Sequence, residues 1–329
     1  MSQDVWVVAE HFQGRLNDIT FELLGKGREL ARTLNGKLAV ALLGSEVGEL
    51  AGQLRSADVI YVADRPDLRD FTPDGYGTVL EAVLKEAAPR LVLLGSTSVG
   101  LDLLSLLSAR GGFACLDNCT RLEVREGRVI STSQIYGGKI FAEVALPEET
   151  TLVGVVPGMF PKEAGQVTGE TEVRALGPPT GLPQARTTFR KLIAPPPGDV
   201  DISKVPVLVA VGRGIQKAES LPQAQELAEV LGGAVCGSRP VIDQGWLPKT
   251  RQVGKSGMTV KPKLYLALGV SGAPEHVEGM RGAELIVAVN TDPKAPIFGV
   301  AHYGIVADLF DVVPPLTEEI RGKQGSRAA

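Results

Sequence analysis

The tripeptide Gly254-Lys255-Ser256, within RQVGKSGMTV (251–260), contains residue types that can bind phosphate. In a P-loop, consecutive backbone N–H groups wrap the phosphate, and a further glycine is needed five residues before this tripeptide. Lys249 occupies that position, and the preceding Trp246-Leu247-Pro248 cannot continue a central strand. The segment is therefore not predicted to be the phosphate loop of an ATPase or GTPase.

Small, polar and cationic residues follow four apolar segments in the C-terminal part of the chain. Parallel sheets bind ligands at the carboxyl ends of their strands, so these residues predict a ligand site. Each group taken alone could also be an ordinary turn. They are Gly212-Arg213-Gly214, Ser238-Arg239, Gly269-Val270-Ser271-Gly272 and Asn290.

Two of these residues are arginines, whose flat, permanent cation can bind a pyrophosphate or lie against a planar ring. His276 comes soon after the glycine loop, at the start of a predicted helix whose free N–H groups favour an anion. For His276 a structural role and a functional role are equally open.

The helices and strands that position these residues are predicted to form two α/β domains. In the first, apolar runs at 5–9, 37–44, 58–63 and 90–95 predict buried parallel strands joined by crossover helices. After Gly112, the segments 121–133, 139–146 and 150–156 predict an antiparallel extension of the same domain, with a Glu126-Gly127 turn.

The second domain is predicted to be doubly wound as well. Its strands are expected at 205–212, 233–237, 263–269 and 284–290, with a helix that starts near Leu221-Pro222. The stretch from 161 to 204 is polar and rich in proline, which marks a boundary. We therefore expect a first domain at 1–190, a linker at 191–204 and a second domain at 205–329.

Composition excludes several classes of function. The net charge of −4 argues against a nucleic-acid partner, which would require a basic surface. Three cysteines without a Cys-x-x-Cys pair predict free thiols and no zinc site. The N-terminus lacks the basic region of a signal peptide, and no apolar run reaches about 18 residues, so a cytoplasmic protein is expected.

The segment LYLALGVSGAPEHVEGMRGAELIVAVNTDPKAPIFGVAHYGIVADLFDVVPPL (264–316) resembles the signature region of the electron-transfer flavoprotein alpha subunit. The resemblance extends upstream through VAVGRGIQKAE, VCGSRPVIDQGW and RQVGKSGMTVKPK, and it includes GSTSVGLDLLSLLSAR and QIYGGKIFAEV in the first domain. It covers essentially the whole chain, and its C-terminal third is the most specific part.

This resemblance implies an electron carrier without a substrate of its own. FAD would lie in the C-terminal, Rossmann-like domain, and a beta subunit, which would hold AMP, would complete a heterodimer. Electrons would come from flavin-linked dehydrogenases, as in fatty acid β-oxidation, and leave to a membrane-associated quinone reductase. The first domain would serve as scaffold and partner contact.

The resemblance also implies roles for individual residues. Arg213 would serve the pyrophosphate, Arg239 would lie against the isoalloxazine ring, and His276 would donate toward the C2 carbonyl. The other implied contacts are Ser238 close to the cofactor; a flavin loop of Gln252, Val253, Gly254, Lys255 and Ser256, with the Ser256 hydroxyl near N5; Ser271, Gly272, Ala273, Pro274 and Glu275 at the pyrophosphate; and Asn290, Asp308 and Leu309 at the adenosine end.

Three positions depart from the family's usual pattern. The family commonly has Thr where Ser256 stands, Gln where Lys255 stands, and Ile-Gln in place of Pro274-Glu275. Glu275 would place a carboxylate near an anionic cofactor. We hypothesise that Lys255 neutralises this carboxylate or offsets the phosphate charge.

The alternative is a nucleotide-dependent enzyme, either an adenine-nucleotide hydrolase or a nicotinamide dehydrogenase. The missing glycine at position 249 argues against the hydrolase. The first strand is followed by AEHFQGRL in place of Gly-x-Gly-x-x-Gly, which argues against the dehydrogenase.

Overall fold

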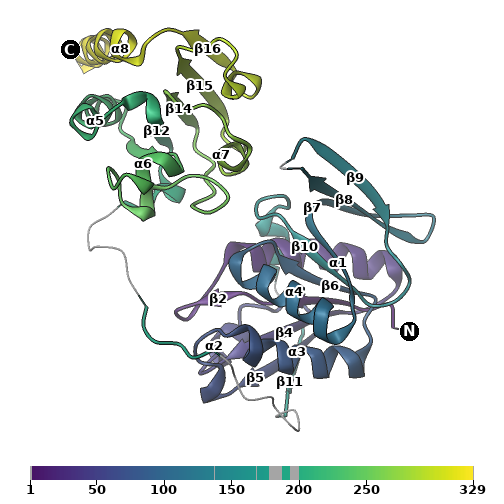
Figure 1. The fold of residues 1–329 in the computed structure, drawn as a ribbon. Helices are drawn as coiled ribbons and strands as arrows, with labels where there is room; N and C mark the ends of the chain where they lie inside the picture. Colours follow the sequence, from purple (N-terminus) through teal and green to yellow (C-terminus); the bar gives the residue numbers. More distant parts are fainter. Residues whose placement is uncertain (1, 137, 168, 178–186, 193–199, 329) are drawn as a thin grey trace. The chain divides into compact units, whose positions relative to one another are not determined.

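A computed structural model describes residues 2–136, 138–167, 169–177, 187–192 and 200–328. The chain divides into two compact units, Met1–Leu192 and Ile193–Ala329, each built around its own sheet (Figure 1). The predicted α/β class is confirmed. Residues 193–199 of the expected linker lie outside the described residues.

The first unit contains a nine-stranded sheet in the order β11-β5-β4-β1-β6-β10-β7-β8-β9. The strands from β11 to β7 are parallel. Four of them confirm the predicted buried strands of the first third: β1 (Val5–Val8), β4 (Leu38–Gly44), β5 (Val59–Asp64) and β6 (Leu91–Gly95). A short hairpin of β2 (His11–Phe12) and β3 (Arg15–Leu16) follows β1.

Helices cover both faces of this sheet. On one face, α1 (Asp18–Leu34) and the short α2 (Gly48–Ala51) pack on the strands, and on the other face α3 (Pro73–Ala87) and α4 (Ser98–Gly111) do so. The side chains of Thr72 and Thr97 cap α3 and α4 by accepting the N–H groups of Gly75 and Gly100. Local capping residues thus set the helix starts.

The antiparallel extension consists of β7 (Ala114–Arg125), β8 (Arg128–Ile135) and β9 (Ile140–Ala145). Glu126 and Gly127 both have positive φ, as the predicted turn requires. Placing 150–156 in this extension was wrong. β10 (Thr151–Val155) lies between β6 and β7, parallel to both and buried throughout, because a continuous apolar run is suited to a strand covered on both faces.

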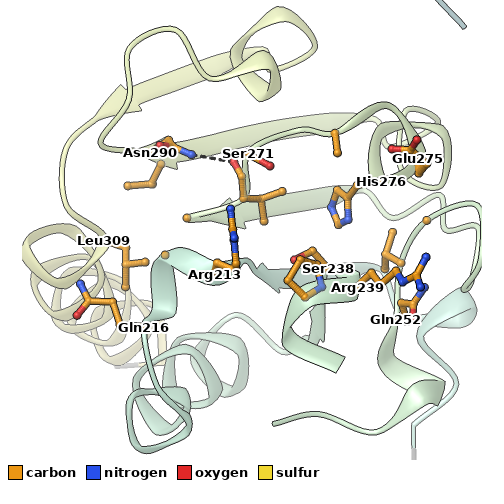
Figure 2. A pocket seen from close by; sticks show the side chains of 18 of the residues that line it. Arg213, Gln216, Ser238, Arg239, Gln252, Ser271, Glu275, His276, Asn290 and Leu309 are labelled. Atoms are coloured by element: carbon orange, nitrogen blue, oxygen red, sulfur yellow. Dashed lines mark hydrogen bonds between the residues drawn. The ribbon is translucent and has the colours of Figure 1, made fainter. Parts of the chain in front are cut away.

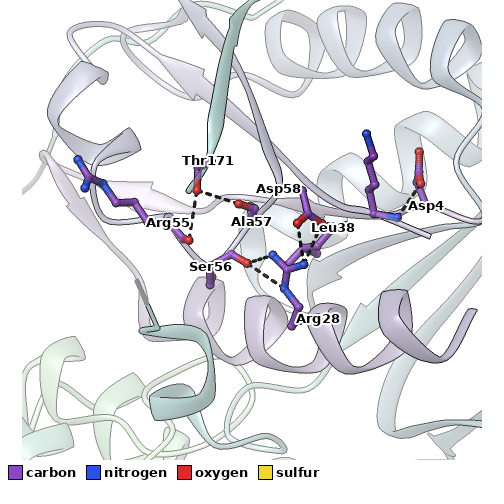
Figure 3. Close-up of polar contacts among 9 residues, drawn as sticks. Asp4, Arg28, Leu38, Arg55, Ser56, Ala57, Asp58 and Thr171 are labelled. Atoms are coloured by element: carbon purple, nitrogen blue, oxygen red, sulfur yellow. Dashed lines mark hydrogen bonds and ion pairs between the residues drawn. The ribbon is translucent and has the colours of Figure 1, made fainter. Parts of the chain in front are cut away.

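β11 (Glu172–Ala175) forms the edge of the sheet next to β5, within the proline-rich stretch. Figure 3 shows the polar contacts that join this edge to α1. Arg28 donates from Nη1 to both carboxylate oxygens of Asp58 at 2.8 and 2.9 Å, and from Nε to the Ser56 carbonyl at 3.0 Å. Thr171 donates to the Ala57 carbonyl at 2.8 Å, so residues 56–58 connect α1 with the segment that leads into β11.

The second unit has a five-stranded parallel sheet in the order β13-β12-β14-β15-β16. Its strands are β12 (Val207–Val211), β13 (Ala234–Gly237), β14 (Leu264–Leu268), β15 (Leu285–Asn290) and β16 (Tyr303–Val306). The first four confirm the predicted strands, whereas β16 was not predicted. The strand order reverses between β12 and β14, where such sheets bind ligands.

One face of this sheet packs against α5 (Leu221–Val230), which begins where it was predicted, and α8 (Leu309–Ala328). The other face is covered by residues of the 253–260 loop and of the segment after α7 (Pro274–Glu278). The short α6 (Arg239–Asp243) follows β13 directly. The carboxyl ends of the strands are therefore surrounded by short helices and loops.

Candidate functional site

A cavity of about 730 Å³ opens at the carboxyl ends of β12 to β15 (Figure 2). Its size is typical of small-molecule and cofactor sites. Of the residues expected at the site, Gly272 and Pro274 do not line the cavity. The expected residues that line it are Arg213, Ser238, Arg239, Gln252, Val253, Gly254, Lys255, Ser256, Ser271, Ala273, Glu275, His276, Asn290, Asp308 and Leu309.

Glycines allow the loops after β12 and β14 to touch at the reversal of strand order. A Cβ atom on Gly212 would lie 2.2 Å from the Gly269 carbonyl oxygen, and one on Gly214 would lie 2.6 Å from the Gly269 Cα. Gly269 itself has a φ of +61°. These contacts leave no room for side chains at the three glycines.

The loop that contains Gly254-Lys255-Ser256 forms a wall of the cavity. Its ends are held by hydrogen bonds from Val253 N to the Gly237 carbonyl at 3.0 Å and from Lys255 N to the Glu275 carbonyl at 2.7 Å. Inside the loop, the buried Gln252 donates from Nε2 to the Ser256 hydroxyl at 2.8 Å. Because that hydroxyl accepts this bond, its own hydrogen is free to donate to a ligand.

Both arginines expected at the site are exposed at its surface. Figure 2 shows Arg213 pointing from the end of β12 toward the loop that carries Ser271. Within the described part of the chain, no carboxylate pairs with Arg213. Arg239 forms an ion pair of 3.3 Å with Asp243. Both side chains are mostly exposed, so this pair holds the Arg239 guanidinium only weakly. Two cations are thus available to an anionic ligand.

His276 is the buried titratable group of the cavity and is 6% exposed. Its Nε2 lies 2.9 Å from the Tyr265 hydroxyl, and its Nδ1 is buried without a hydrogen-bond partner. Burial lowers the pKa of His276 to about 4, and an interaction with the Val253 backbone opposes this shift only in part. The ring is therefore neutral at pH 7, and its Nδ1 is not exposed to the cavity.

Asn290 and Asp308 line the cavity, and hydrogen bonds brace both side chains. Asn290 donates to the Val270 carbonyl at 2.9 Å and accepts from Asp292 N at 2.9 Å. Asp308 accepts from Phe310 N at 3.0 Å, at the start of α8. Both side chains therefore stabilise the loops that line the cavity after β15 and β16.

The hypothesised ion pair between Lys255 and Glu275 is not present. Lys255 Nζ lies 3.9 Å from Glu278, and its contact with Glu275 is made by the backbone. The reason is the placement of α7: Glu278 is three residues beyond Glu275 and points to the same side as the Lys255 ammonium.

Sequence reasoning missed several lining residues. Gln216 follows the Gly212-Arg213-Gly214 turn with a φ of +68°, and Thr291 follows the end of β15 directly. Their position next to a strand end was the signal available for them. The other missed lining residues are Pro240, Val289 and Ala307.

The first unit has a small hollow of about 20 Å³ beside His11, whose Nε2 lies 2.7 Å from the Leu43 carbonyl oxygen. A wider hollow of about 650 Å³ in the same unit is bordered by Arg90, Arg128 and Glu148. Among the described residues, no three His, Cys, Asp or Glu side chains gather as metal ligands would. The described helices also include none with the length and apolar character needed to span a bilayer.

Comparisons with known proteins agree with this geometry. The family model described as the electron transfer flavoprotein domain matches residues 5–179, and the electron transfer flavoprotein FAD-binding domain matches residues 201–281. The electron transfer flavoprotein subunit alpha of Thermoanaerobacterium thermosaccharolyticum is 36% identical over 97% of this chain and 98% of its own length.

Two further relatives have names that refer to larger assemblies. The acryloyl-CoA reductase electron transfer subunit beta of Anaerotignum propionicum is 35% identical over 99% of this chain and 97% of its own length. The lactate dehydrogenase (NAD(+),ferredoxin) subunit LctC of Acetobacterium woodii is 34% identical over 98% of this chain and 78% of its own length. With two family domains in order and relatives matched along nearly its full length, this chain belongs to the electron-transfer flavoprotein alpha-subunit family.

Proposed function

We propose that this chain binds FAD in the cavity of its second unit and acts as the alpha subunit of a heterodimeric electron carrier. The observation that carries the proposal is the cavity of about 730 Å³ at the carboxyl ends of the strands, whose lining includes the exposed cations Arg213 and Arg239. A dinucleotide supplies a pyrophosphate and a planar ring, which are the two groups that arginine binds best. The description of the matched second domain as FAD-binding supports the same ligand.

The residues of the cavity fit FAD along its length. Arg213 and the backbone at 271–275 would hold the pyrophosphate, with Gly272 and Pro274 shaping this loop from outside the cavity. Arg239, Ser238 and the 252–256 loop would hold the isoalloxazine ring. Leu309 offers an apolar contact for the adenine, between Asn290 and Asp308.

Bound FAD supplies one- and two-electron redox chemistry, and the protein supplies position and charge. The Arg239 cation would favour added negative charge on a nearby ring and so raise its midpoint potential, although exposure to water weakens this effect. The Ser256 hydroxyl would donate to a ring nitrogen. The neutral His276 would line the site without adding charge.

An apolar surface on the first unit supports a partner subunit. Large apolar side chains on β8 and β9 and in the turn between them are 37 to 77% exposed: Ile135, Tyr136, Ile140, Phe141 and Val144. Clusters of this kind mark protein contacts, and this one lies on β8 and β9, the last two strands at one end of the sheet. In this proposal, residues 1–190 contact an electron-transfer flavoprotein beta subunit, which holds AMP, and residues 205–329 carry FAD.

The proposed electron donors are flavin-linked dehydrogenases such as those of fatty acid β-oxidation, in the cytoplasm, and the acceptor is a membrane-associated quinone reductase. The names of two relatives favour a second candidate, an electron-transfer subunit held within a larger oxidoreductase complex. Stable co-purification with a dehydrogenase subunit would favour this second candidate. Electron exchange with freely diffusing dehydrogenases would favour the carrier.

The test of FAD binding is co-expression with the beta subunit. The purified heterodimer is expected to be yellow and to release FAD and AMP on denaturation, and Arg213→Ala is expected to lower FAD affinity by roughly 10-fold or more, since a charge-assisted contact is lost. Arg32→Ala, on the surface of α1, is the matched control. A colourless heterodimer that releases no FAD would overturn the proposal.

A further inference from the structure

A buried side-chain amide links a lysine outside the cavity to a hydroxyl group that lines it. Gln252 is 1% exposed, and its Oε1 accepts a hydrogen bond from Lys249 Nζ at 2.8 Å. On the other side, its Nε2 donates to the Ser256 hydroxyl oxygen at 2.8 Å. Gln252, labelled in Figure 2, and Ser256 both line the cavity, whereas Lys249, in the 3₁₀ turn Lys249–Arg251, does not.

The ammonium group of Lys249 decides which way round this amide lies. An ammonium donates hydrogen bonds and cannot accept them, so the amide oxygen faces it. A reversed amide would bring its NH₂ group against the ammonium, and two donors would meet at 2.8 Å. The backbone keeps the two residues together, because Gln252 N donates to the Lys249 carbonyl at 3.1 Å. Lys249 therefore fixes the orientation of Gln252.

The orientation of Gln252 in turn sets the direction of the Ser256 hydroxyl. Because Nε2 faces it, the hydroxyl oxygen accepts, and its own hydrogen is left for another acceptor. Ser256 is exposed and makes no other side-chain hydrogen bond within the described part of the chain, so this hydrogen is available to a ligand in the cavity. A reversed amide would present Oε1, which would accept the hydrogen and withdraw it from the cavity.

We propose that Lys249 is a positioning residue that acts through Gln252 and keeps the Ser256 hydroxyl as a hydrogen-bond donor to the bound ligand. This inference rests on the proposed function for its ligand, since that function places the hydroxyl at a ring nitrogen of FAD. A ring nitrogen with a lone pair and no hydrogen needs a donor, and the donor binds it more strongly as an added electron makes it more negative. Lys249 would thus affect the flavin without touching it.

The orientation of the amide can be read in the full chain without FAD. With glutamine labelled by ¹⁵N at its side-chain amide, the signal of Gln252 is identified by its loss in Gln252→Glu. Its Nε2 hydrogens are expected to show stronger nuclear Overhauser contacts to the β-hydrogens of Ser256 than to the ε-hydrogens of Lys249.

Variants of Lys249 test its part in this orientation. Lys249 is exposed, so its variants are expected to fold. Lys249→Met removes the donor, and both orientations of the amide should then appear, whereas Lys249→Arg keeps a donor and should retain the wild-type pattern. Lys263→Met is the matched control, because Lys263 is exposed and lies just before β14, at the opposite end of that strand from the cavity.

The second measurement uses the heterodimer with FAD. Gln252→Glu keeps the shape of the side chain and its contact with Lys249, but it presents an acceptor to Ser256 in place of a donor. In a Ser256→Ala background, only the charge effect of this substitution remains. The fall in FAD affinity is expected to be roughly 3- to 10-fold larger with the hydroxyl than without it, the range for one hydrogen bond. The midpoint potential for the first electron should likewise become more negative by a larger amount when the hydroxyl is present.

Lys249→Met should lower FAD affinity roughly 2-fold, since about half of the molecules would hold the amide reversed. Wild-type amide hydrogens that lie against Lys249, or a Lys249→Met spectrum like that of the wild type, overturn the inference. So does a Gln252→Glu effect of equal size with and without the Ser256 hydroxyl. A wild type that binds no FAD refutes the proposed function instead, and the contacts measured in the full chain still test the role of Lys249.

Discussion

The ammonium of Lys255 lies 3.9 Å from the carboxylate of Glu278, while the backbone N–H of Lys255 donates to the Glu275 carbonyl at 2.7 Å. Lys255 is 49% exposed, and ion pairs of this kind contribute little. Within the described residues, the Glu275 side chain has no cationic partner. Glu275 is therefore a lining carboxylate that would repel an anionic cofactor, and Lys255 is a lining cation that acts independently of it.

This arrangement predicts that Lys255 and Glu275 affect FAD affinity independently. Lys255→Gln should weaken binding a few-fold and Glu275→Gln should strengthen it a few-fold, both less so at high salt, because exposed charges are screened. The double variant should show additive effects, measured by FAD titration of the heterodimer. Glu278→Gln is the control, because it removes only the weak pair with Lys255. Its free energy of unfolding is expected to change by less than about 0.5 kcal/mol. A coupling energy near 1 kcal/mol or more between Lys255 and Glu275 would contradict this.

The buried His276 predicts a loss of stability in acid. Its pKa is lowered from 6.5 in the unfolded chain to about 4 in the folded chain, so below pH 6.5 the unfolded state takes up a proton first. The stability that the neutral His276 ring contributes is complete above pH 6.5 and is lost as the pH falls toward 4. Between pH 7.5 and pH 5 it amounts to about 2 kcal/mol of unfolding free energy.

Urea unfolding of the full chain at both pH values checks this prediction, with His276→Gln as the comparison. Carboxylates elsewhere in the chain affect both proteins equally, so the difference between them isolates His276. The wild type should lose about 2 kcal/mol more than the variant on acidification. Equal losses in the two proteins would show that the ring is not held neutral by burial.

Much of this fold could be predicted because it depends on local patterns. The apolar runs at β4 and β14 are buried along most of their length, and such runs are recognisable without knowledge of their neighbours. Strand order is different: β10 was placed with the antiparallel strands because it follows them in the chain, but it inserts between β6 and β7. β16 was missed because its apolar run is short: it has four residues, and Gly304 interrupts the run after Tyr303.

In the site, too, local features could be predicted from the sequence and long-range contacts could not. The ends of the predicted strands identified most of the residues that line the cavity, because parallel strands bring their carboxyl ends to the same edge of the sheet. Side-chain pairing could not be predicted: Lys255 turns to Glu278 because a helix of five residues places that carboxylate within reach. The partnership of Tyr265 with His276 likewise depends on how α7 packs over β14, which no spacing in the sequence reveals.

The loop at residues 252–258 should tolerate no side chain at Gly254. This residue has a φ of +135°, and a Cβ atom there would lie 2.8 Å from the Glu275 carbonyl oxygen. Gly254→Ala should destabilise the second unit by about 1 to 3 kcal/mol and weaken FAD binding by at least roughly 10-fold, because the loop must move away from α7. FAD titration and urea unfolding measure the two effects.

Gly299→Ala is the matched control for this loop. Gly299 lies in the same unit, in the 3₁₀ turn Pro296–Gly299, and a Cβ atom there would meet open space. Its effect on stability should stay within about 0.5 kcal/mol, with FAD affinity unchanged. A Gly254→Ala protein that binds FAD like the wild type would refute the role assigned to the loop.

The contacts of Arg28 should stabilise the first unit without affecting the cavity. Its guanidinium binds the Asp58 carboxylate and the Ser56 carbonyl, and its side chain is 25% exposed (Figure 3). Arg28→Ala removes these bonds, and a cost of about 1 to 2 kcal/mol is expected, since Asp58 is partly in water and keeps the bond from Leu38 N. Arg32→Ala, an exposed arginine on the same helix, should cost less than about 0.5 kcal/mol. Trp6 is buried in the first unit, and its fluorescence, measured in a Trp246→Phe background, reports the unfolding of that unit, whereas release of FAD reports the unfolding of the second. Loss of FAD affinity in Arg28→Ala beyond roughly 2-fold would show that the two units are energetically coupled, contrary to this prediction.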